Sequence, residues 1–185
     1  MLLRPSESLK IAEELGIPVP EWSKDPSIGA PAYVKADVPL PHKTEAKAVT
    51  FAESEEELKR AFDLLKERYG EVIVQRAVKG DLELLVSSKL DEVFGRVAVI
   101  AMGGIYASLI REAIVTKCPV CEELVRLKLA NSKIGQVMRY RKKLNEECVV
   151  DVIKKLCLTD AKTFEVNPLI VSEENCWAVD VKVWI

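Results

Sequence analysis

Residues 162–185 read KTFEVNPLIVSEENCWAVDVKVWI, a pattern that predicts two β-strands joined by a polar turn at the end of the chain. The expected strands cover residues 163–171 and 176–184, and the turn covers residues 172–175. Both strands are rich in Val, Ile, Phe and Trp, the residues enriched in β-structure, whereas the turn is Ser-Glu-Glu-Asn. The terminal segment therefore predicts an antiparallel hairpin, the element from which the rest of the chain can be interpreted.

Polar side chains interrupt both strands of this expected hairpin. Residues two apart share a face of a strand, so Glu165 and Asn167 point the same way, and Phe164 and Val166 point the other way into a core. A hairpin can place Asp180 beside the first pair, and two carboxylates with an amide oxygen suit Mg²⁺ carrying nucleotide phosphates. The alternative is that Asp180 simply faces water on a one-sided sheet.

Length and composition indicate an ordinary globular protein. The 185 residues suffice for one domain or two small lobes sharing a site, with 49% hydrophobic and 30% charged residues. The net charge of −2 gives no general reason to expect nucleic acid or an anionic membrane as a partner. No apolar run is long enough to span a bilayer and the N-terminus lacks a signal-peptide pattern, so we expect a cytoplasmic protein.

Five cysteines occur, at positions 118, 121, 148, 157 and 176. Their odd number, without a secretion signal, argues against a disulfide framework. Cys118 and Cys121 form a CxxC motif, but a zinc site usually needs a second close pair. We therefore expect small, semi-buried residues at a helix start, with a metal or redox module as the alternative.

The remaining pattern predicts helices alternating with groups of strands. Apolar spacing and capping residues indicate helices over residues 6–15, 54–69, 122–140 and 146–156, and strands over residues 32–36, 46–51, 72–78, 82–90 and 94–102. The expected fold class is α+β, with a mainly antiparallel sheet and helices packed on one side.

Two short segments carry weaker signals for phosphate binding. Gly103 and Gly104 follow an expected strand, where paired glycines suit either a plain turn or close approach of the backbone to a phosphate. Residues 139–143, RYRKK, are most simply a solvated helix end that complements the helix dipole, with a phosphate contact as the alternative.

Three stretches together resemble a known family. The first is YVK at residues 33–35, leading to HKTEAKAV at residues 42–49; the second is GDLELL at residues 80–85, leading to MGGI at residues 102–105; the third is FEVNPLIV at residues 164–171 with AVD at residues 178–180. They resemble the ATP-grasp β subunit or domain of the NDP-forming acyl-CoA synthetases, which include the ADP-forming acetate–CoA ligases and relatives of succinyl-CoA synthetase.

This resemblance implies an ATP-grasp fold of two lobes with the nucleotide between them. Residues 1–30 are then an N-terminal helix and linker, residues 31–75 the N-terminal lobe, and residues 76–185 the C-terminal lobe with a metal-binding hairpin. The cofactors implied are Mg²⁺ and ATP or ADP.

The resemblance also implies roles for individual residues on the nucleotide side. Lys35 matches a lysine that reaches the phosphates, and a compact ammonium suits that task. The backbone of Gln75, Arg76 and Ala77 matches the hinge that meets adenine, and Glu83 matches an acid near the ribose. Gly103 and Gly104 join this nucleotide-binding set.

On the metal side, Asn167 and Asp180 match the Mg²⁺ ligands of the family, with Glu165 beside them. His42, the single histidine, matches a loop histidine that relays a phosphoryl group to the nucleotide, for which imidazole is chemically suited. The alternative for His42 is an exposed histidine without a role. Acyl-CoA synthesis would need an α-type subunit that supplies the CoA-binding domain, and a homo- or hetero-oligomer is possible.

Several features depart from the family pattern and support an alternative function. Residues 20–32 are too short and too Pro-rich for the helix that the family usually has before the lysine strand, and Arg141-Lys142 stands where an Arg-Gly pair is expected. Ser108 and Thr116 stand where the family usually has a glutamate and an arginine, although Lys117 is adjacent to the second. A catalytically degenerate ATP-grasp protein, acting as a nucleotide-binding or structural partner, is the competing hypothesis.

Overall fold

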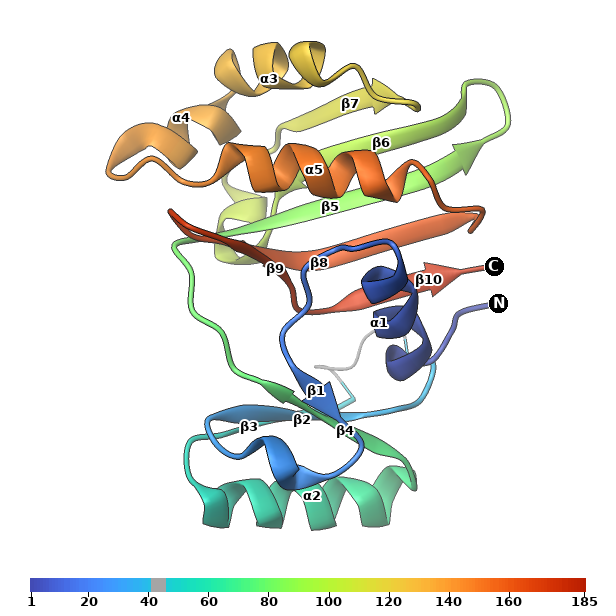
Figure 1. The fold of residues 1–185 in the computed structure, drawn as a ribbon, viewed down its shortest axis with the longest axis vertical. Coiled ribbons are helices and arrows are strands. Elements are labelled where there is room, and N and C mark those ends of the chain that lie inside the picture. The colour runs from blue at the N-terminus through green and yellow to red at the C-terminus, as the bar shows by residue number, and fades with distance from the viewer. Residues whose placement is uncertain (41–45) are drawn as a thin grey trace.

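The computed structural model describes residues 1–40 and 46–185, which form a four-stranded sheet and a six-stranded sheet. Figure 1 shows the two sheets stacked along the long axis of the molecule, the smaller one with α2 below it and the larger one beside α3, α4 and α5. Pairing throughout both sheets is antiparallel. The predicted α+β class and the two-lobed ATP-grasp architecture are confirmed.

The smaller lobe has the strand order β1-β4-β2-β3, from β1 (Trp22–Ser23), β2 (Ala32–Ala36), β3 (Val49–Ala52) and β4 (Val72–Arg76). Helix α2 (Glu55–Tyr69) covers one face, and a short 3-10 helix, η1 (Pro26–Ile28), precedes β2. The backbone N–H of Glu57 donates to the hydroxyl of Ser54 at 3.3 Å, which confirms the predicted helix start. Apolar residues of α2, β2 and β4 form a separate small core.

The larger lobe has the strand order β10-β8-β5-β6-β7, and β9 pairs with the other end of β8. Its strands are β5 (Leu82–Asp91), β6 (Gly95–Met102), β7 (Ala113–Lys117), β8 (Thr163–Val171), β9 (Cys176–Ala178) and β10 (Val181–Trp184). Its helices are η2 (Gly104–Ser108), α3 (Glu122–Ala130), α4 (Lys133–Tyr140) and α5 (Glu146–Leu156). Helix α5 lies across the sheet in Figure 1.

Alternation of side chains along the strands gives the large sheet two different faces. Leu84 and Val86 of β5 and Phe164 and Val166 of β8 are buried in one core with residues of α5. The residues between them are more exposed and lie on the opposite face, as the period of two requires. The sheet therefore buries one face under helices and leaves the other face more exposed.

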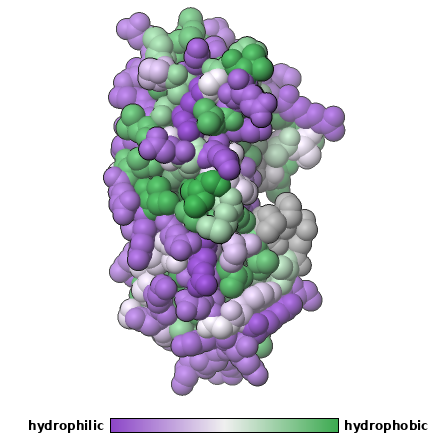
Figure 2. Space-filling view, turned by 90° about the vertical axis from the view of Figure 1, so that its right-hand side faces the viewer, coloured by the Kyte–Doolittle hydropathy of each residue, from purple (hydrophilic) through white to green (hydrophobic). Residues whose placement is uncertain are grey.

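The two ends of the chain meet near helix α1 (Pro5–Glu14). Leu2 pairs with Trp184 at the end of β10, and the backbone N–H of Leu3 donates to the carbonyl of Val183 at 2.9 Å. Figure 2 shows the side of the molecule on which both termini lie, with hydrophobic residues at mid-height between more hydrophilic ends. The helix ends before Gly16, whose φ of +72° is the left-handed conformation expected of a helix stop.

The predicted cap of α1 is wrong in detail. The helix begins at Pro5, and Ser6 lies in its first turn instead of preceding it. The backbone N–H and the hydroxyl of Ser6 both donate to the fully buried carboxylate of Asp37, at 2.8 and 2.7 Å. An anion at a helix N-terminus is favourable because it meets unpaired N–H groups, so Asp37 satisfies the helix end from outside.

Three element predictions are corrected by the structure. The single helix expected over residues 122–140 is two helices, because the hydroxyl of Ser132 accepts from the N–H of Gly135 and starts α4 anew. The last strand divides into β9 and β10 at Val179 and Asp180. Strand β7 was not predicted, and the 46–51 strand is found at Val49–Ala52.

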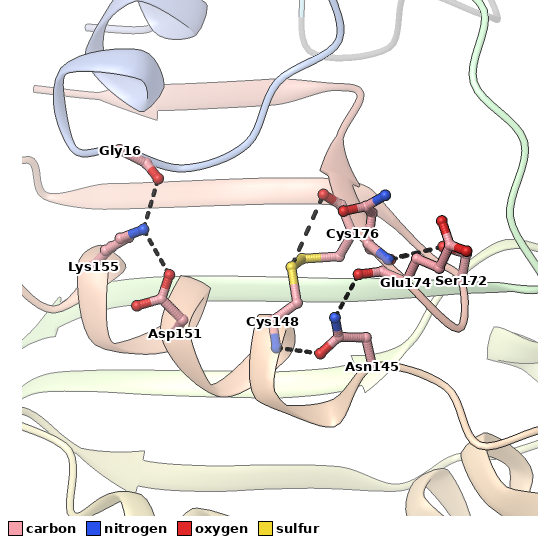
Figure 3. Close-up of a disulfide and its surroundings, with 9 residues drawn as sticks. Gly16, Asn145, Cys148, Asp151, Lys155, Ser172, Glu174 and Cys176 are labelled. Carbon is pink, nitrogen blue, oxygen red and sulfur yellow. Dashed lines mark hydrogen bonds and ion pairs between the residues drawn. A yellow bond between two sulfur atoms is a disulfide. The ribbon is translucent and has the colours of Figure 1, made fainter.

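The argument against disulfides is also wrong, because four cysteines pair. Cys118 is bonded to Cys157, and Cys148 is bonded to Cys176, which leaves Cys121 as an exposed free thiol. Both bridges involve α5, one in its first turn and one at its C-cap. Figure 3 shows the Cys148–Cys176 bridge beside Asn145, whose side chain accepts from the N–H of Cys148 and donates to the carbonyl of Glu174.

Candidate functional site

The terminal ribbon brings the predicted metal ligands together. Val166 pairs with Val181 and Glu165 pairs with Lys182, so the next residues along, Asn167 and Asp180, also lie opposite each other. The backbone N–H of Asn167 donates to the carbonyl of Asp180 at 2.9 Å. The expected placement of Asp180 beside Glu165 and Asn167 therefore agrees with the strand register.

A lysine that sequence reasoning missed stands between the two carboxylates. The ammonium of Lys182 is 3.8 Å from a carboxylate oxygen of Glu165 and 3.8 Å from one of Asp180. All three side chains are at least two-thirds buried, so solvent screens these pairs less than surface pairs. The signal was present in the sequence, because Lys182 is two residues after Asp180 and shares its face in a strand pattern.

The donor chemistry of this cluster fits Mg²⁺ bound with a nucleotide. Two carboxylates and an amide oxygen are hard ligands, and Mg²⁺ usually completes its shell with substrate phosphates and water. Among residues 1–40 and 46–185, no group of three His, Cys, Asp or Glu side chains is arranged to hold a metal ion.

Lys35 reaches the same cluster from the smaller lobe. It lies in β2 with only 5% of its surface exposed, and its ammonium donates to the carbonyl oxygen of Val179 at 2.8 Å. It also donates to the side-chain oxygen of Gln75 at 2.5 Å. Val179 directly precedes Asp180, so the ammonium of one lobe is held by the segment of the other lobe that carries Asp180.

The expected adenine hinge follows β4. The backbone N–H of Arg76 donates to the carbonyl of Glu21 at 2.8 Å, and that of Ala77 donates to Pro31 at 3.1 Å. The Arg76 side chain bonds Glu21 and the carbonyl of Ile28. A base at this hinge would have to meet groups other than these two N–H groups.

The paired glycines contact the strand that carries Glu83. The N–H of Gly103 donates to the carbonyl of Glu83 at 2.9 Å. Gly104 has φ of +55°, and a Cβ there would overlap the Glu83 carboxylate. The glycine pair forms a tight turn that allows η2 to lie against the Glu83 side chain. This geometry fits both a plain turn and a turn whose backbone approaches a phosphate.

Two departures from the family pattern fall in different environments. Ser108 ends the exposed helix η2, and its hydroxyl lies 3.5 Å from the carbonyl of Ile105. Thr116 is buried under the sheet, so its neighbours Val115 and Lys117 lie on the opposite face of β7. Lys117 therefore lies on the exposed face of β7. An arginine at position 116 would point to the buried face instead.

Two residues of the basic segment 139–143, at the end of α4, form ion pairs. Arg139 pairs with Glu146 at 3.0 Å, and Lys142 pairs with Asp81 at 3.1 Å and Glu173 at 3.3 Å. These contacts agree with a helix end fixed by neighbouring acids. Beside it lies a pocket of about 510 Å³, lined in part by Tyr106, Tyr140 and Arg141.

The other expected features have different outcomes. His42 lies outside the described residues, so its predicted phosphoryl-relay role stays a prediction. Cys118 is bonded to Cys157, which removes it from a zinc or dithiol site with Cys121. No helix in the described ranges is both long and apolar enough to cross a membrane.

Comparisons with known proteins agree with the fold. A family model described as the ATP-grasp domain matches residues 1–185. The acetate–CoA ligase (ADP-forming) I of Archaeoglobus fulgidus is 28% identical over 96% of this chain and 30% of its own length. The β subunit of acetate–CoA ligase (ADP-forming) I of Pyrococcus furiosus is 25% identical over 96% of this chain and 89% of its own length.

Solved structures show the same fold. The dinucleotide-forming acetyl-coenzyme A synthetase 1 of Ca. Korarchaeum cryptofilum superimposes with a TM-score of 0.89 at 19% identity, covering 100% of this chain and 93% of that chain. Another structure of that enzyme, with coenzyme A and Mg-AMPPCP, has its phosphohistidine segment pointing towards the nucleotide-binding site. It gives a TM-score of 0.84 at 21% identity, covering 98% of this chain and 91% of that chain.

Proposed function

This chain belongs to the ATP-grasp domain family, and we propose that it is the nucleotide-binding component of an ADP-forming acyl-CoA synthetase. The chain is homologous to β subunits of acetate–CoA ligases, which supports this choice over a degenerate structural protein. The observation that carries the proposal is the meeting of Lys35 with the Val179–Asp180 segment. A cation from one lobe and acids from the other are the groups that a magnesium-bound nucleotide requires.

In this proposal the phosphates of ADP or ATP lie between the lobes. Lys35 neutralises phosphoryl oxygens, and Glu83 accepts hydrogen bonds from the ribose. Asn167 and Asp180, with Glu165 beside them, hold Mg²⁺, which neutralises the phosphate charge when bound. The segment from Gln75 to Ala77 and the turn at Gly103 and Gly104 border the nucleotide.

His42 carries the transfer step of the proposal. A phosphoryl group on an imidazole nitrogen moves to the terminal phosphate oxygen of ADP, so that a P–N bond breaks and a P–O bond forms. The electron pair of the broken bond returns to the imidazole nitrogen, and ATP is released. An α-type subunit that binds coenzyme A supplies the phosphorylated intermediate on which His42 draws.

Titration of the purified protein with Mg-ADP tests nucleotide binding. We expect measurable heat at millimolar nucleotide, and roughly tenfold or more weaker binding for Lys35→Met, because an ion–phosphate contact is lost. Lys10→Met is the matched control, since Lys10 is exposed on α1. No heat with the wild type would reject the proposal. If the protein binds Mg-ADP but transfers no labelled phosphate, the histidine step alone is rejected. The same holds if the transfer of labelled phosphate persists in His42→Ala.

A further inference from the structure

Gln75 is a fully buried polar residue in the layer between the two lobes. It has 0% of its surface exposed, in β4, and is paired with Tyr33 while Ile73 is paired with Lys35. Paired residues and residues two apart share a face, so Gln75, Ile73 and Lys35 lie on one side of the small sheet. Ile73 packs into the core of the larger lobe, which places this side toward that lobe.

The amide of Gln75 has one orientation that the structure supports. Its oxygen accepts a hydrogen bond of 2.5 Å from the ammonium of Lys35, and an ammonium can only donate hydrogen bonds. The amide nitrogen is therefore directed away from Lys35, and it is buried with no hydrogen-bond partner among residues 1–40 and 46–185. A buried donor left unpaired costs about 1–3 kcal/mol, so its retention calls for an explanation.

We propose that Gln75 positions Lys35 for the nucleotide phosphates and donates its unpaired side-chain N–H to an acceptor atom of the bound nucleotide. This inference rests on the proposed function, because it needs a nucleotide between the lobes. The oxygen of Gln75 and the carbonyl of Val179 hold the ammonium from both lobes. A bound nucleotide brings the acceptor that the amide nitrogen lacks, so binding removes the penalty of the unpaired donor.

The other glutamine of the chain supplies the control. Gln136 is exposed on α4, so Gln136→Met and Gln136→Glu make the same chemical changes away from Lys35. Gln75→Met keeps the length of the side chain and removes both the acceptor and the donor. Gln75→Glu keeps an acceptor for Lys35, removes the N–H donor and adds a carboxylate charge. Circular dichroism melting of each variant verifies that it is folded before binding is measured.

Calorimetric titration with Mg-ADP separates positioning from a merely structural role. We expect at least roughly twentyfold weaker binding for Gln75→Met, and a loss of only about fivefold when Lys35→Met is already present, because the positioning effect is then gone and only the bond from Gln75 to the nucleotide is lost. Gln75→Glu should bind at least about fivefold more weakly than the wild type, since a bond to the nucleotide is lost. Equal losses in both backgrounds, or a Gln75→Met variant that binds like the wild type, would overturn the positioning role.

Nuclear magnetic resonance of the wild-type protein gives a second, independent readout. The side-chain NH₂ signals of Gln75, assigned by their absence in Gln75→Met, should shift when Mg-ADP is added, while those of Gln136 stay in place. Unshifted Gln75 signals in a protein that binds Mg-ADP would overturn this inference and leave the proposed function intact. Absence of any binding by the wild type would reject both. Where Lys35→Met binds too weakly for calorimetry, the Gln75 shift decides.

Discussion

The ammonium of Lys35 lies 2.8 Å from the carbonyl oxygen of Val179, although 144 residues separate them in the chain. This hydrogen bond links β2 of the smaller lobe to the turn between β9 and β10 of the larger lobe. Because Lys35 is buried, the bond forms where little water competes for either group. The two lobes are thus joined at the point where the candidate ligands converge.

Lys35→Met should destabilise the protein even without nucleotide. The substitution leaves the oxygens of Gln75 and Val179 buried without this donor, which costs about 1–3 kcal/mol in the free energy of unfolding. Urea unfolding followed by circular dichroism measures the change, with Lys10→Met expected to match the wild type. A higher unfolding midpoint for Lys35→Met would show instead that desolvation of the ammonium dominates.

Lys182→Met should strengthen Mg²⁺ binding in the presence of ADP. Lys182 offsets the negative charge of Glu165 and Asp180, and the metal has to compete with this ammonium. Each such pair is worth about 1 kcal/mol or less, so a roughly three- to tenfold gain in Mg²⁺ affinity is expected.

Titration of Mg²⁺ at fixed ADP measures this gain, and Lys162→Met serves as the control because Lys162 is exposed just before β8. Weaker Mg²⁺ binding by Lys182→Met would mean that the lysine itself holds the phosphates. Equal gains in both lysine variants would point to net charge instead of position.

The terminal ribbon was predictable because its information is local. Alternation along residues 163–171 placed Glu165 and Asn167 on one face, and a hairpin turn necessarily brings the next strand alongside. The break at Val179 and Asp180 was not visible, since a single polar residue at Asp180 is compatible with a continuous strand that has one face toward water. The single helix predicted over residues 122–140 was wrong for a different reason. Ser132 is a good N-cap, but the apolar residues on both sides of it keep one helical period, so the pattern does not show the break.

The non-local contacts were beyond the sequence. Cysteine pairing depends on where α5 packs, and an odd number of cysteines is compatible with two bridges and one free thiol. The bond between Lys35 and Val179 depends on the relative position of two sheets, which no local period reports. The fold and the ligand types were therefore predictable, whereas the contacts that connect them were not.

The disulfide bridges should contribute substantially to stability. They close loops with sequence separations of 39 and 28, so each should raise the free energy of unfolding by roughly 2–4 kcal/mol. Cys176→Ser should lower the urea midpoint of unfolding under non-reducing conditions. In reductant, which breaks both bridges in the wild type, the two proteins should unfold at the same urea concentration. Cys121→Ser is the control and should change little.

Thiol titration provides a direct check on these bridges. Denatured, non-reduced protein should react at one cysteine, Cys121, and reduced protein at all five. Five reactive thiols without reductant would contradict both bridges.

The ion pairs between α3 and α5 should make stability fall in acid. Hydrogen bonds from Lys154 and Arg126 hold the pKa of Glu122 below its ordinary value, and Arg126 does the same for the pKa of Glu147. A lowered folded-state pKa gives stability that is present above the unfolded value near 4.5 and is lost as pH falls through the folded value.

Glu122→Gln should therefore lower the unfolding midpoint at pH 7 and have no effect once the pH is below the folded-state pKa of Glu122. Because the carboxylate is exposed to solvent, the change at pH 7 should be small. Urea unfolding across pH 2 to 7 measures both limits, and Glu123→Gln, one residue along the same helix, is the control. A loss that is equally large at pH 2 would show that packing, not charge, is responsible.

Gly104→Ala should separate backbone strain from displacement of Glu83. A Cβ at Gly104 overlaps the Glu83 carboxylate, which is the end of a flexible, exposed side chain and can rotate away. The stability cost should then come mainly from the positive φ, about 1–2 kcal/mol. Gly70→Ala is the matched control, because Gly70 also has a positive φ but has no atom within 4 Å of an added Cβ. Similar losses of unfolding free energy are expected for both variants.

Binding of Mg-ADP should weaken roughly three- to tenfold only in Gly104→Ala, because a hydrogen bond to the displaced carboxylate of Glu83 is lost. A much larger stability loss in Gly104→Ala would show that Glu83 is fixed in place, and unchanged nucleotide binding would remove Glu83 from the proposed site.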